Sequence, residues 1–186
     1  MSRIGLATDS HGGISQEEAK KLGIMVLPMP FYFDDDCYYE GVSMTREEFF
    51  RRLNAGDKVS TSQPSPEAVM KLWRDGLKEY DQIIYMPMSS GLSGSCNTAR
   101  MLAEESEFEN KVFVVDNGRV STPQHRALLD ALELIEEGHS ADKIKEILEN
   151  ERDKMSIYIA VETLEFLKKG WTCHTGYGSS WYTAKY

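Results

Sequence analysis

Residues 81–98 constrain the fold more than any other part of the chain, because they read as a buried strand, a turn and a helix in succession. Residues 83–86 form a short apolar run that is partly β-branched, which is the pattern of a buried strand. A Ser- and Gly-rich turn follows, and apolar residues such as Leu92, Ala99 and Met101 then recur at helical spacing. Hydroxyls and free backbone N–H groups at a helix N-terminus favour an anion, either a carboxylate or a phosphate. The pattern fits a well-capped turn without a ligand equally well.

Strand-like runs alternate with amphipathic helical patterns along the whole chain. Strands are predicted at residues 4–7, 24–27, 83–86, 112–115 and 157–161. The helices between them have predicted N-caps at Ser15, Thr45, Ser65, Ser121 or Thr122, and Ser140. This alternation is typical of an α/β fold with a mostly parallel sheet and helices on both faces. We expect residues 83–86 at the centre of the sheet, with residues 4–7 and 112–115 nearby.

The composition argues against several classes of function. The chain has 186 residues and a formal net charge of −9, from 21 basic and 30 acidic residues without a basic cluster. Nucleic acid is therefore not an expected partner. No apolar run approaches the ~20 residues needed to span a bilayer, and no secretory leader precedes the first strand, so we expect a cytoplasmic protein without stable membrane insertion. The three cysteines show neither a disulfide nor a zinc pattern, and no cofactor is expected.

A second informative stretch covers residues 58–66, KVSTSQPSP. Two prolines and four hydroxyl residues in nine positions predict an irregular loop. Ser65 suits a helix N-cap, since Pro66 would then occupy the first helical position. The Ser/Thr-rich loop at residues 58–66 and the Ser/Gly-rich turn at residues 89–94 thus lie at the two ends of one helix–strand unit. In a parallel sheet both loops can meet at the carboxyl edge, where open α/β sheets bind ligands.

Three shorter features have a functional and a structural interpretation. Residues 34–36 are consecutive aspartates, but they lack the glycine and terminal glutamate of a calcium loop, so an exposed hairpin tip is expected. Residues 8–10, Thr-Asp-Ser, follow the first strand, where they either face a ligand or form turn and cap interactions. Cys96 lies early in a helix, where a thiol pKa can be lowered; a small buried residue is the expected role.

The order of five motifs carries a family resemblance. They are TDS at residues 8–10, STSQPSP at 60–66, SSGLSG at 89–94, VVD at 114–116 and TLEFLKKG at 163–170. With these motifs the chain resembles the DegV family of bacterial fatty-acid-binding proteins. The resemblance implies a two-domain α/β protein that holds a long-chain fatty acid, with the carboxylate at the domain junction and the tail in a buried apolar tunnel. It also implies a carrier that presents the ligand to a fatty-acid kinase subunit and performs no chemistry itself.

The resemblance implies specific ligand contacts when its motifs are carried over position by position. Thr61 and Ser93 are the implied main contacts of the carboxylate, and Ser62 and Ser90 are the next. Neutral hydroxyl and amide groups suit this task, because they bind a carboxylate without the desolvation cost of a buried ion pair.

The end of the chain departs from the family pattern. After Gly170, family members continue with a glycine, an arginine and a second domain, whereas this chain ends in residues 171–186, WTCHTGYGSSWYTAKY. Read one base out of frame, the codons of residues 171–174 can encode Gly-Arg and then Val or Ala. We therefore expect a one-base insertion near the codon of Gly170; a genuine short variant is the alternative. Either way we expect a domain at residues 1–170, a disordered or loosely packed tail and impaired fatty-acid binding.

A serine-dependent hydrolase acting on an acyl ester is the alternative function. Ser89, Ser90 and Ser93 lie in a strand–turn–helix, but SSGLSG is not the G-x-S-x-G pattern of a nucleophile elbow. Such an enzyme also needs a base. Of the four histidines, at positions 11, 125, 139 and 174, only His11 is expected near the turn. Nucleotide binding is disfavoured as well, because neither G-x-x-x-x-G-K-[ST] nor G-x-G-x-x-G occurs.

Overall fold

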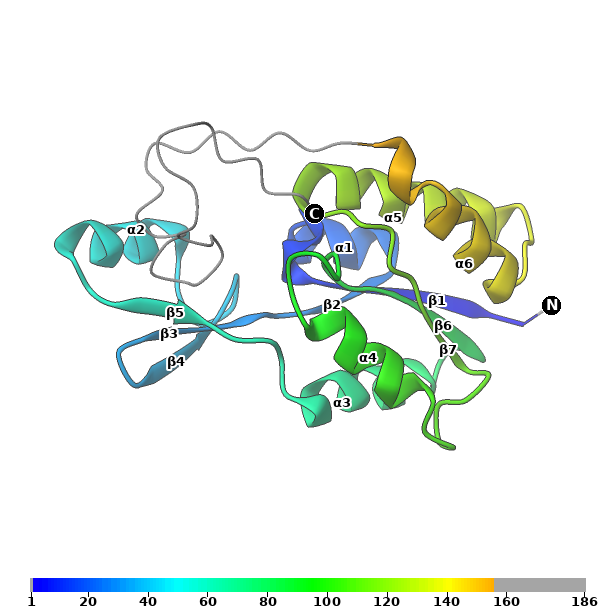
Figure 1. Ribbon diagram of the computed structural model, residues 1–186, viewed down its shortest axis with the longest axis horizontal. Helices are drawn as coiled ribbons and strands as arrows, with labels where there is room; N and C mark the ends of the chain where they lie inside the picture. Colours follow the sequence, from blue (N-terminus) through cyan, green and yellow to red (C-terminus); the bar gives the residue numbers. More distant parts are fainter. Residues whose placement is uncertain (1, 156–186) are drawn as a thin grey trace, which may run out of the picture. The chain divides into compact units, whose positions relative to one another are not determined.

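Within the described part of the chain, a four-stranded parallel sheet carries the core (Figure 1). The structure is a computed structural model that describes residues 2–155. The strands are β1 (Ile4–Asp9), β2 (Ile24–Leu27), β6 (Gln82–Met86) and β7 (Val112–Val114), in the order β2-β1-β6-β7. Each neighbouring pair is parallel, and β6 lies between β1 and β7. The predicted fold class and the predicted place of residues 83–86 are thereby confirmed.

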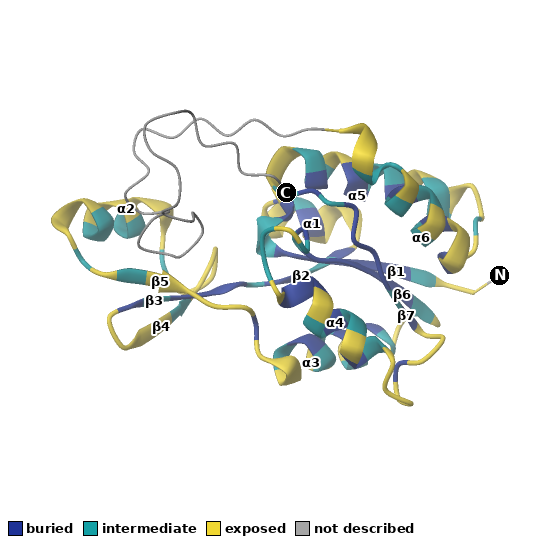
Figure 2. Ribbon diagram, viewed as in Figure 1, coloured by how far each residue is buried: buried dark blue, intermediate teal, exposed yellow. Residues whose placement is uncertain are grey.

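Helices cover both faces of this sheet, as predicted (Figures 1 and 2). One face packs against α1 (Gln16–Leu22), α5 (Ser121–Glu136) and α6 (Ala141–Asn150), and the other against α3 (Pro66–Gly76) and α4 (Ser95–Ala103). Successive side chains of β6 point to opposite faces. Ile84 and Met86 therefore belong to the first core, whereas Ile83 and Tyr85 belong to the second. All four are almost fully buried, which explains why the strand is continuously apolar.

The second core contains a group of three aromatic side chains. Trp73 of α3 is fully buried and packs edge-on against Tyr85, at 5.5 Å between ring centroids, and against Phe108, at 5.1 Å. Gly76 ends α3 where it approaches the sheet: a Cβ there would lie 2.7 Å from the sulfur of Met25. The absence of a side chain at this position lets the helix lie close to the strands.

A smaller antiparallel sheet was not predicted as such. It consists of β3 (Pro30–Phe33), β4 (Asp36–Tyr39) and β5 (Val59–Thr61), with α2 (Arg46–Ala55) beside it (Figure 1). The β3–β4 turn confirms the expected hairpin tip at residues 34–36, which are exposed. Among residues 2–155 no cluster of His, Cys, Asp or Glu could hold a metal ion.

The prediction that residues 58–66 form no regular structure is wrong in its first part. Residues 59–61 form β5, which pairs with β3 at the edge of the small sheet. The two prolines lie beyond the strand, so they remove none of its hydrogen bonds.

Most helix starts follow the predicted capping. The hydroxyls of Ser15, Thr45, Ser65 and Ser140 each accept a backbone N–H three residues ahead. The predicted cap of α5 is wrong. Val120, whose backbone is extended, is the N-cap; Ser121 is the first residue of the helix and has a φ of 56°, outside the extended region that a cap requires.

The helix predicted from Leu92 begins only at Ser95, since residues 89–93 form a hydrogen-bonded turn. Met101 of this helix faces solvent rather than the core.

Short 3₁₀ helices occur at η1 (Ser10–Gly12) and η2 (Arg152–Lys154). Within the described part of the chain, none of the helices is both long enough and apolar enough to cross a bilayer. The strand predicted at residues 157–161, the helix at 163–169 and the tail at 171–186 lie outside the described residues.

Candidate functional site

The loops at the carboxyl edge of the large sheet enclose a cavity of about 720 Å³. It is bordered by η1, by the start of β3, by α2, by the end of β5 and by the turn that follows β6. Thr61, Ser62 and Ser93 all lie in its wall. Two loops that are far apart in the sequence therefore bring three of the four predicted site residues to one space.

Ser90, the fourth predicted residue, lies elsewhere. It is not part of the cavity wall. Its hydroxyl accepts a hydrogen bond from Arg152 Nη2 at 3.3 Å, and its backbone N–H donates to Asp116 at 3.3 Å. Ser90 is therefore placed to hold the turn together rather than to touch a molecule in the cavity.

The cavity has a polar and an apolar part. Thr61 ends β5 and pairs in register with Phe31, so that its hydroxyl lies next to an aromatic strand. Phe31 packs edge-on against Phe49 of α2, at 5.3 Å between ring centroids. The apolar part of the wall includes Met29, Phe31, Phe49, Phe50 and Leu92. Such a space suits an amphiphile with a small polar head and an apolar body.

The hydroxyl of Ser93 is available to a ligand. Its oxygen accepts the backbone N–H of Ser95 at 3.1 Å, which fixes its position at the start of α4. A hydroxyl that accepts one hydrogen bond still has its own proton to donate. Ser62, in contrast, donates to the carbonyl of Gln63 at 3.1 Å and would have to exchange that bond to donate to a ligand.

The backbone N–H groups of the turn after β6 are not free; the free N–H groups that the sequence suggested belong to the N-terminus of the helix that follows this turn and begins at Ser95. All six N–H groups from Met88 to Ser93 donate to acceptors within the protein. Those acceptors are the carboxylates of Asp9 and Asp116, the carbonyl of Arg119, and the hydroxyl and carbonyl of Ser89. The hydroxyls therefore remain as the polar groups of this turn that can meet an anion.

An acidic cluster lies beside the hydroxyls, and sequence reasoning missed most of it. Ser10 donates to Glu40 at 2.6 Å, and His11 lies 3.8 Å from Asp9 and 4.0 Å from Glu40. Burial raises the pKa of Asp9, although backbone N–H groups of Met88 and His11 oppose this. Glu40 gave no signal in the sequence, because it reaches the site only through the fold of the β3–β4 hairpin.

The three histidines among residues 2–155, His11, His125 and His139, contact acidic groups rather than the serines of the turn. Among the described residues, no hydrogen bond joins a histidine to Ser89, Ser90 or Ser93. His125 instead lies 3.1 Å from Glu18, and His139 lies 3.2 Å from Glu137. His11 shares the cavity wall with Ser93 but contacts acidic groups.

Cys96 has the structural role that was expected. It is fully buried in α4, and burial together with the nearby Asp116 raises the pKa of its thiol to about 11. The possibility of a lowered pKa is thereby ruled out. At a pH of about 8 only roughly one thiol in a thousand would be the reactive thiolate.

We therefore expect iodoacetamide to distinguish two cysteines of the native protein. Exposed Cys37 should be alkylated readily, whereas Cys96 should react only after unfolding. Peptide mass spectrometry after timed labelling measures both rates. Equal rates for the two thiols in the native protein would contradict the burial of Cys96.

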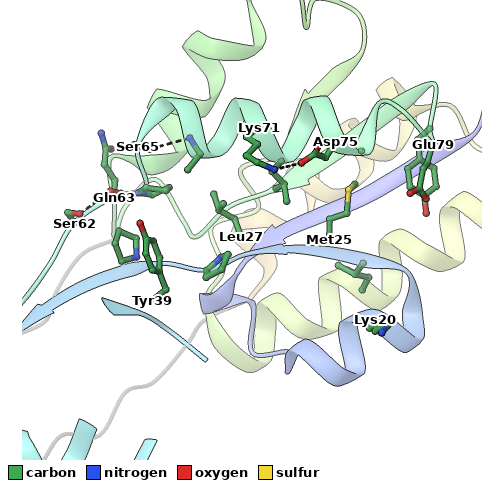
Figure 3. Close-up of a pocket in the computed structure, with 18 of the residues that line it drawn as sticks. Lys20, Met25, Leu27, Tyr39, Ser62, Gln63, Ser65, Lys71, Asp75 and Glu79 are labelled. Carbon is green, nitrogen blue, oxygen red and sulfur yellow. Dashed lines mark hydrogen bonds and ion pairs between the residues drawn. The ribbon is translucent and has the colours of Figure 1, made fainter. Parts of the chain in front are cut away.

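A second cavity, of about 860 Å³, lies between β2 and α3 (Figure 3). Met25 and Leu27 form part of its apolar wall, and Lys71 and Asp75 form an ion pair on α3. Ser62 and Gln63 contribute to the walls of both cavities. Thr61 and Ser93 border only the smaller cavity, which is therefore the candidate site.

Known proteins match this chain over most of its length. The family described as "Uncharacterised protein, DegV family" matches residues 3–170. A DegV domain-containing protein of Deinococcus radiodurans is 31% identical over 166 residues, which are 89% of this chain and 58% of the relative. A fatty-acid-binding DegV family protein of Thermus thermophilus has a similar structure, with a TM-score of 0.79 and 34% identity over 91% of this chain and 60% of that one. DegV of Bacillus subtilis, described as a fatty acid binding protein, gives a TM-score of 0.73 and 26% identity over 82% of this chain and 55% of that one. This chain therefore spans at most about three fifths of the length of these relatives.

Proposed function

Because this chain belongs to the DegV family, we propose that it is a carrier that binds a long-chain fatty acid by its carboxylate and has no catalytic activity of its own. The observation that carries the proposal is the cavity wall, where Thr61, Ser62 and Ser93 border the same space as a set of aromatic and aliphatic side chains. The solved relatives described as fatty-acid-binding proteins support the ligand class.

The hydroxyls of the wall are groups that can bind a carboxylate. Thr61 and Ser93 are the two contacts that we assign to it, with Ser62 beside them. A hydroxyl donating to a carboxylate makes a charge-assisted hydrogen bond, which is stronger than a neutral one. The acyl chain would leave this polar end toward the apolar part of the wall, where Phe31 and Leu92 lie.

In this proposal the protein is a carrier that presents the bound fatty acid to a partner enzyme. A fatty acid held by hydroxyls keeps its carboxylate chemically unchanged, so that a kinase subunit in the cytoplasm could phosphorylate it. The 186 residues alone would bind the ligand weakly, since they span at most about three fifths of the relatives and leave the cavity open. In this proposal the domain comprises residues 1–170, and the rest of the enclosure comes from a second domain.

The carboxylate contacts are tested by Thr61→Val and Ser93→Ala in a fusion of residues 1–170 with the C-terminal part of a DegV relative. Each change should weaken oleate binding about ten- to a hundredfold, since a hydrogen bond to a charged group contributes roughly 1.5–3 kcal/mol. Isothermal titration gives the dissociation constants. Ser60→Ala is the matched control, because Ser60 precedes Thr61 in β5 and does not border the cavity.

The outcomes separate the two candidate functions. Unchanged oleate binding in both variants would place the carboxylate elsewhere. Hydrolysis of an acyl ester that is lost in Ser93→Ala or in Ser90→Ala would favour the hydrolase instead.

A further inference from the structure

Two buried aspartates stand on either side of the turn that carries Ser93. Asp9 is the last residue of β1, and Asp116 follows β7. Since β6 lies between these two strands, the turn that leaves β6 has one aspartate on each flank. The exposed fractions of Asp9 and Asp116 are 0% and 1%. The proposed function gives neither of these buried carboxylates a role.

Asp9 connects the turn to β1. Its Oδ2 accepts the backbone N–H of Met88 at 2.8 Å, and its Oδ1 accepts the backbone N–H of His11 at 3.0 Å. One carboxylate thus fixes both its own loop and the first residue of the neighbouring turn.

Asp116 connects the turn to β7 in a similar way. Its Oδ1 accepts the N–H groups of Ser90 and Gly118, each at 3.3 Å, and its Oδ2 pairs with Arg152 at 2.6 Å. Burial alone would raise the pKa of Asp116, but hydrogen bonds from Ser90 and the charge of Arg152 outweigh it, so the pKa lies below its usual value.

The two attachments reach Ser93 through Ser89. The residue between the two attached positions is Ser89, whose carbonyl accepts the N–H groups of Leu92, at 2.9 Å, and Ser93, at 3.1 Å. A shift of Met88 or Ser90 would therefore move Ser89 and with it Ser93. Neither aspartate borders the cavity.

We propose that Asp9 and Asp116 are positioning residues for the fatty-acid site: they hold the turn at Met88 and Ser90 so that the Ser93 hydroxyl faces the cavity. This inference rests on the proposed function, because it assigns the purpose of the arrangement to the carboxylate contact. The attachments themselves are features of the ligand-free turn and can be measured without a ligand.

The first measurement is amide hydrogen exchange in the 186-residue chain carrying Asp9→Asn or Asp116→Asn. At Asp9 one amide oxygen replaces the two carboxylate oxygens that serve Met88 and His11. At Asp116 the neutral amide no longer pairs with the charge of Arg152, so each variant weakens the attachment of the turn.

We expect exchange of the amides of residues 88–93 to become about ten- to a hundredfold faster, while the amides of α5 keep their rates. Asp34→Asn is the matched control, since Asp34 is exposed at the hairpin tip and asparagine tolerates its φ of 52°. Unchanged exchange at residues 88–93 would overturn the inference.

The second measurement shows whether Asp9 acts through Ser93. Oleate dissociation constants are compared for Asp9→Asn in the fusion protein with Ser93 intact and in the same fusion carrying Ser93→Ala. If Asp9 positions Ser93, Asp9→Asn should lower the oleate affinity at least about tenfold when Ser93 is intact. It should change the affinity hardly at all when Ser93 is already alanine, roughly as for coupled residues. A general loosening of the fold predicts the same loss in both backgrounds, and that result would also overturn the inference. If Ser93→Ala itself leaves oleate binding unchanged, the proposed carboxylate contact fails, while hydrogen exchange still decides the positioning role.

Discussion

Replacement of Trp73 by alanine is expected to lower the free energy of unfolding by about 3–5 kcal/mol, the range for deleting a large aromatic side chain from a core. Trp73 is fully buried and fills the space between α3 and the sheet, where it packs against Tyr85 and Phe108. Its removal leaves a cavity that α3 cannot close without leaving the strands. Because the total free energy of unfolding of a typical domain is only about 5–15 kcal/mol, the variant should be close to unfolding at room temperature.

Urea denaturation followed by circular dichroism measures this effect. Met101→Ala is the control: it also shortens a long side chain on a helix, but the exposed fraction of Met101 is 72%, so the change should stay within about 0.5 kcal/mol. Trp73→Phe adds a second comparison. Among residues 2–155 the indole N–H of Trp73 has no hydrogen-bond partner. Phenylalanine therefore loses volume but no hydrogen bond, and it should lower the free energy of unfolding less than alanine does. Equal stabilities of Trp73→Ala and Met101→Ala would contradict the described packing of α3.

Fusion to the C-terminal part of a DegV relative should increase the affinity for palmitate by several orders of magnitude over that of the 186-residue chain. The reason is the acyl tail, which contributes ~0.8 kcal/mol for each buried methylene. If the open cavity leaves roughly seven methylenes in water, about 6 kcal/mol of binding free energy is lost. This loss raises the dissociation constant by roughly four powers of ten. Phe50, with an exposed fraction of 45%, shows how open the apolar wall is.

The comparison needs both proteins side by side in palmitate titrations, with light scattering to follow their association state. An uncovered apolar wall favours self-association, so the 186-residue chain should also form larger species than the fusion. Stoichiometric sub-micromolar binding by a monodisperse monomer of the 186-residue chain would show that the second domain is not required.

The parts of the fold that were predictable depend on short-range patterns. The run at residues 83–86 is continuously apolar because both faces of β6 are covered, and that pattern was enough to place the strand. The caps at Ser15 and Ser65 were equally accessible, since a cap is a contact between residues three positions apart.

The parts that were missed depend on contacts between distant segments. Val59–Thr61 becomes a strand only because β3 offers an edge about thirty residues earlier, so its polar sequence carried no signal. The attachment of the turn at residues 88–93 was not predicted either, because Asp9 lies 79 positions before its partner Met88. Thr61 and Ser93 were reached through the family resemblance, whereas the cavity that joins them is visible only in the structure.

The pairing of β1 with β6 also sets the order in which the protein can fold. Thr8 donates to the carbonyl of Met86, 78 positions later, and the whole β1–β6 register spans this distance. Contacts between such distant positions close long loops, and domains that depend on them fold slowly compared with helical bundles. During synthesis the first strand must therefore wait until β6 has left the ribosome before the centre of the sheet can form. The Ser93 turn directly follows that strand, so the candidate cavity cannot be complete before β6 is available to pair with β1.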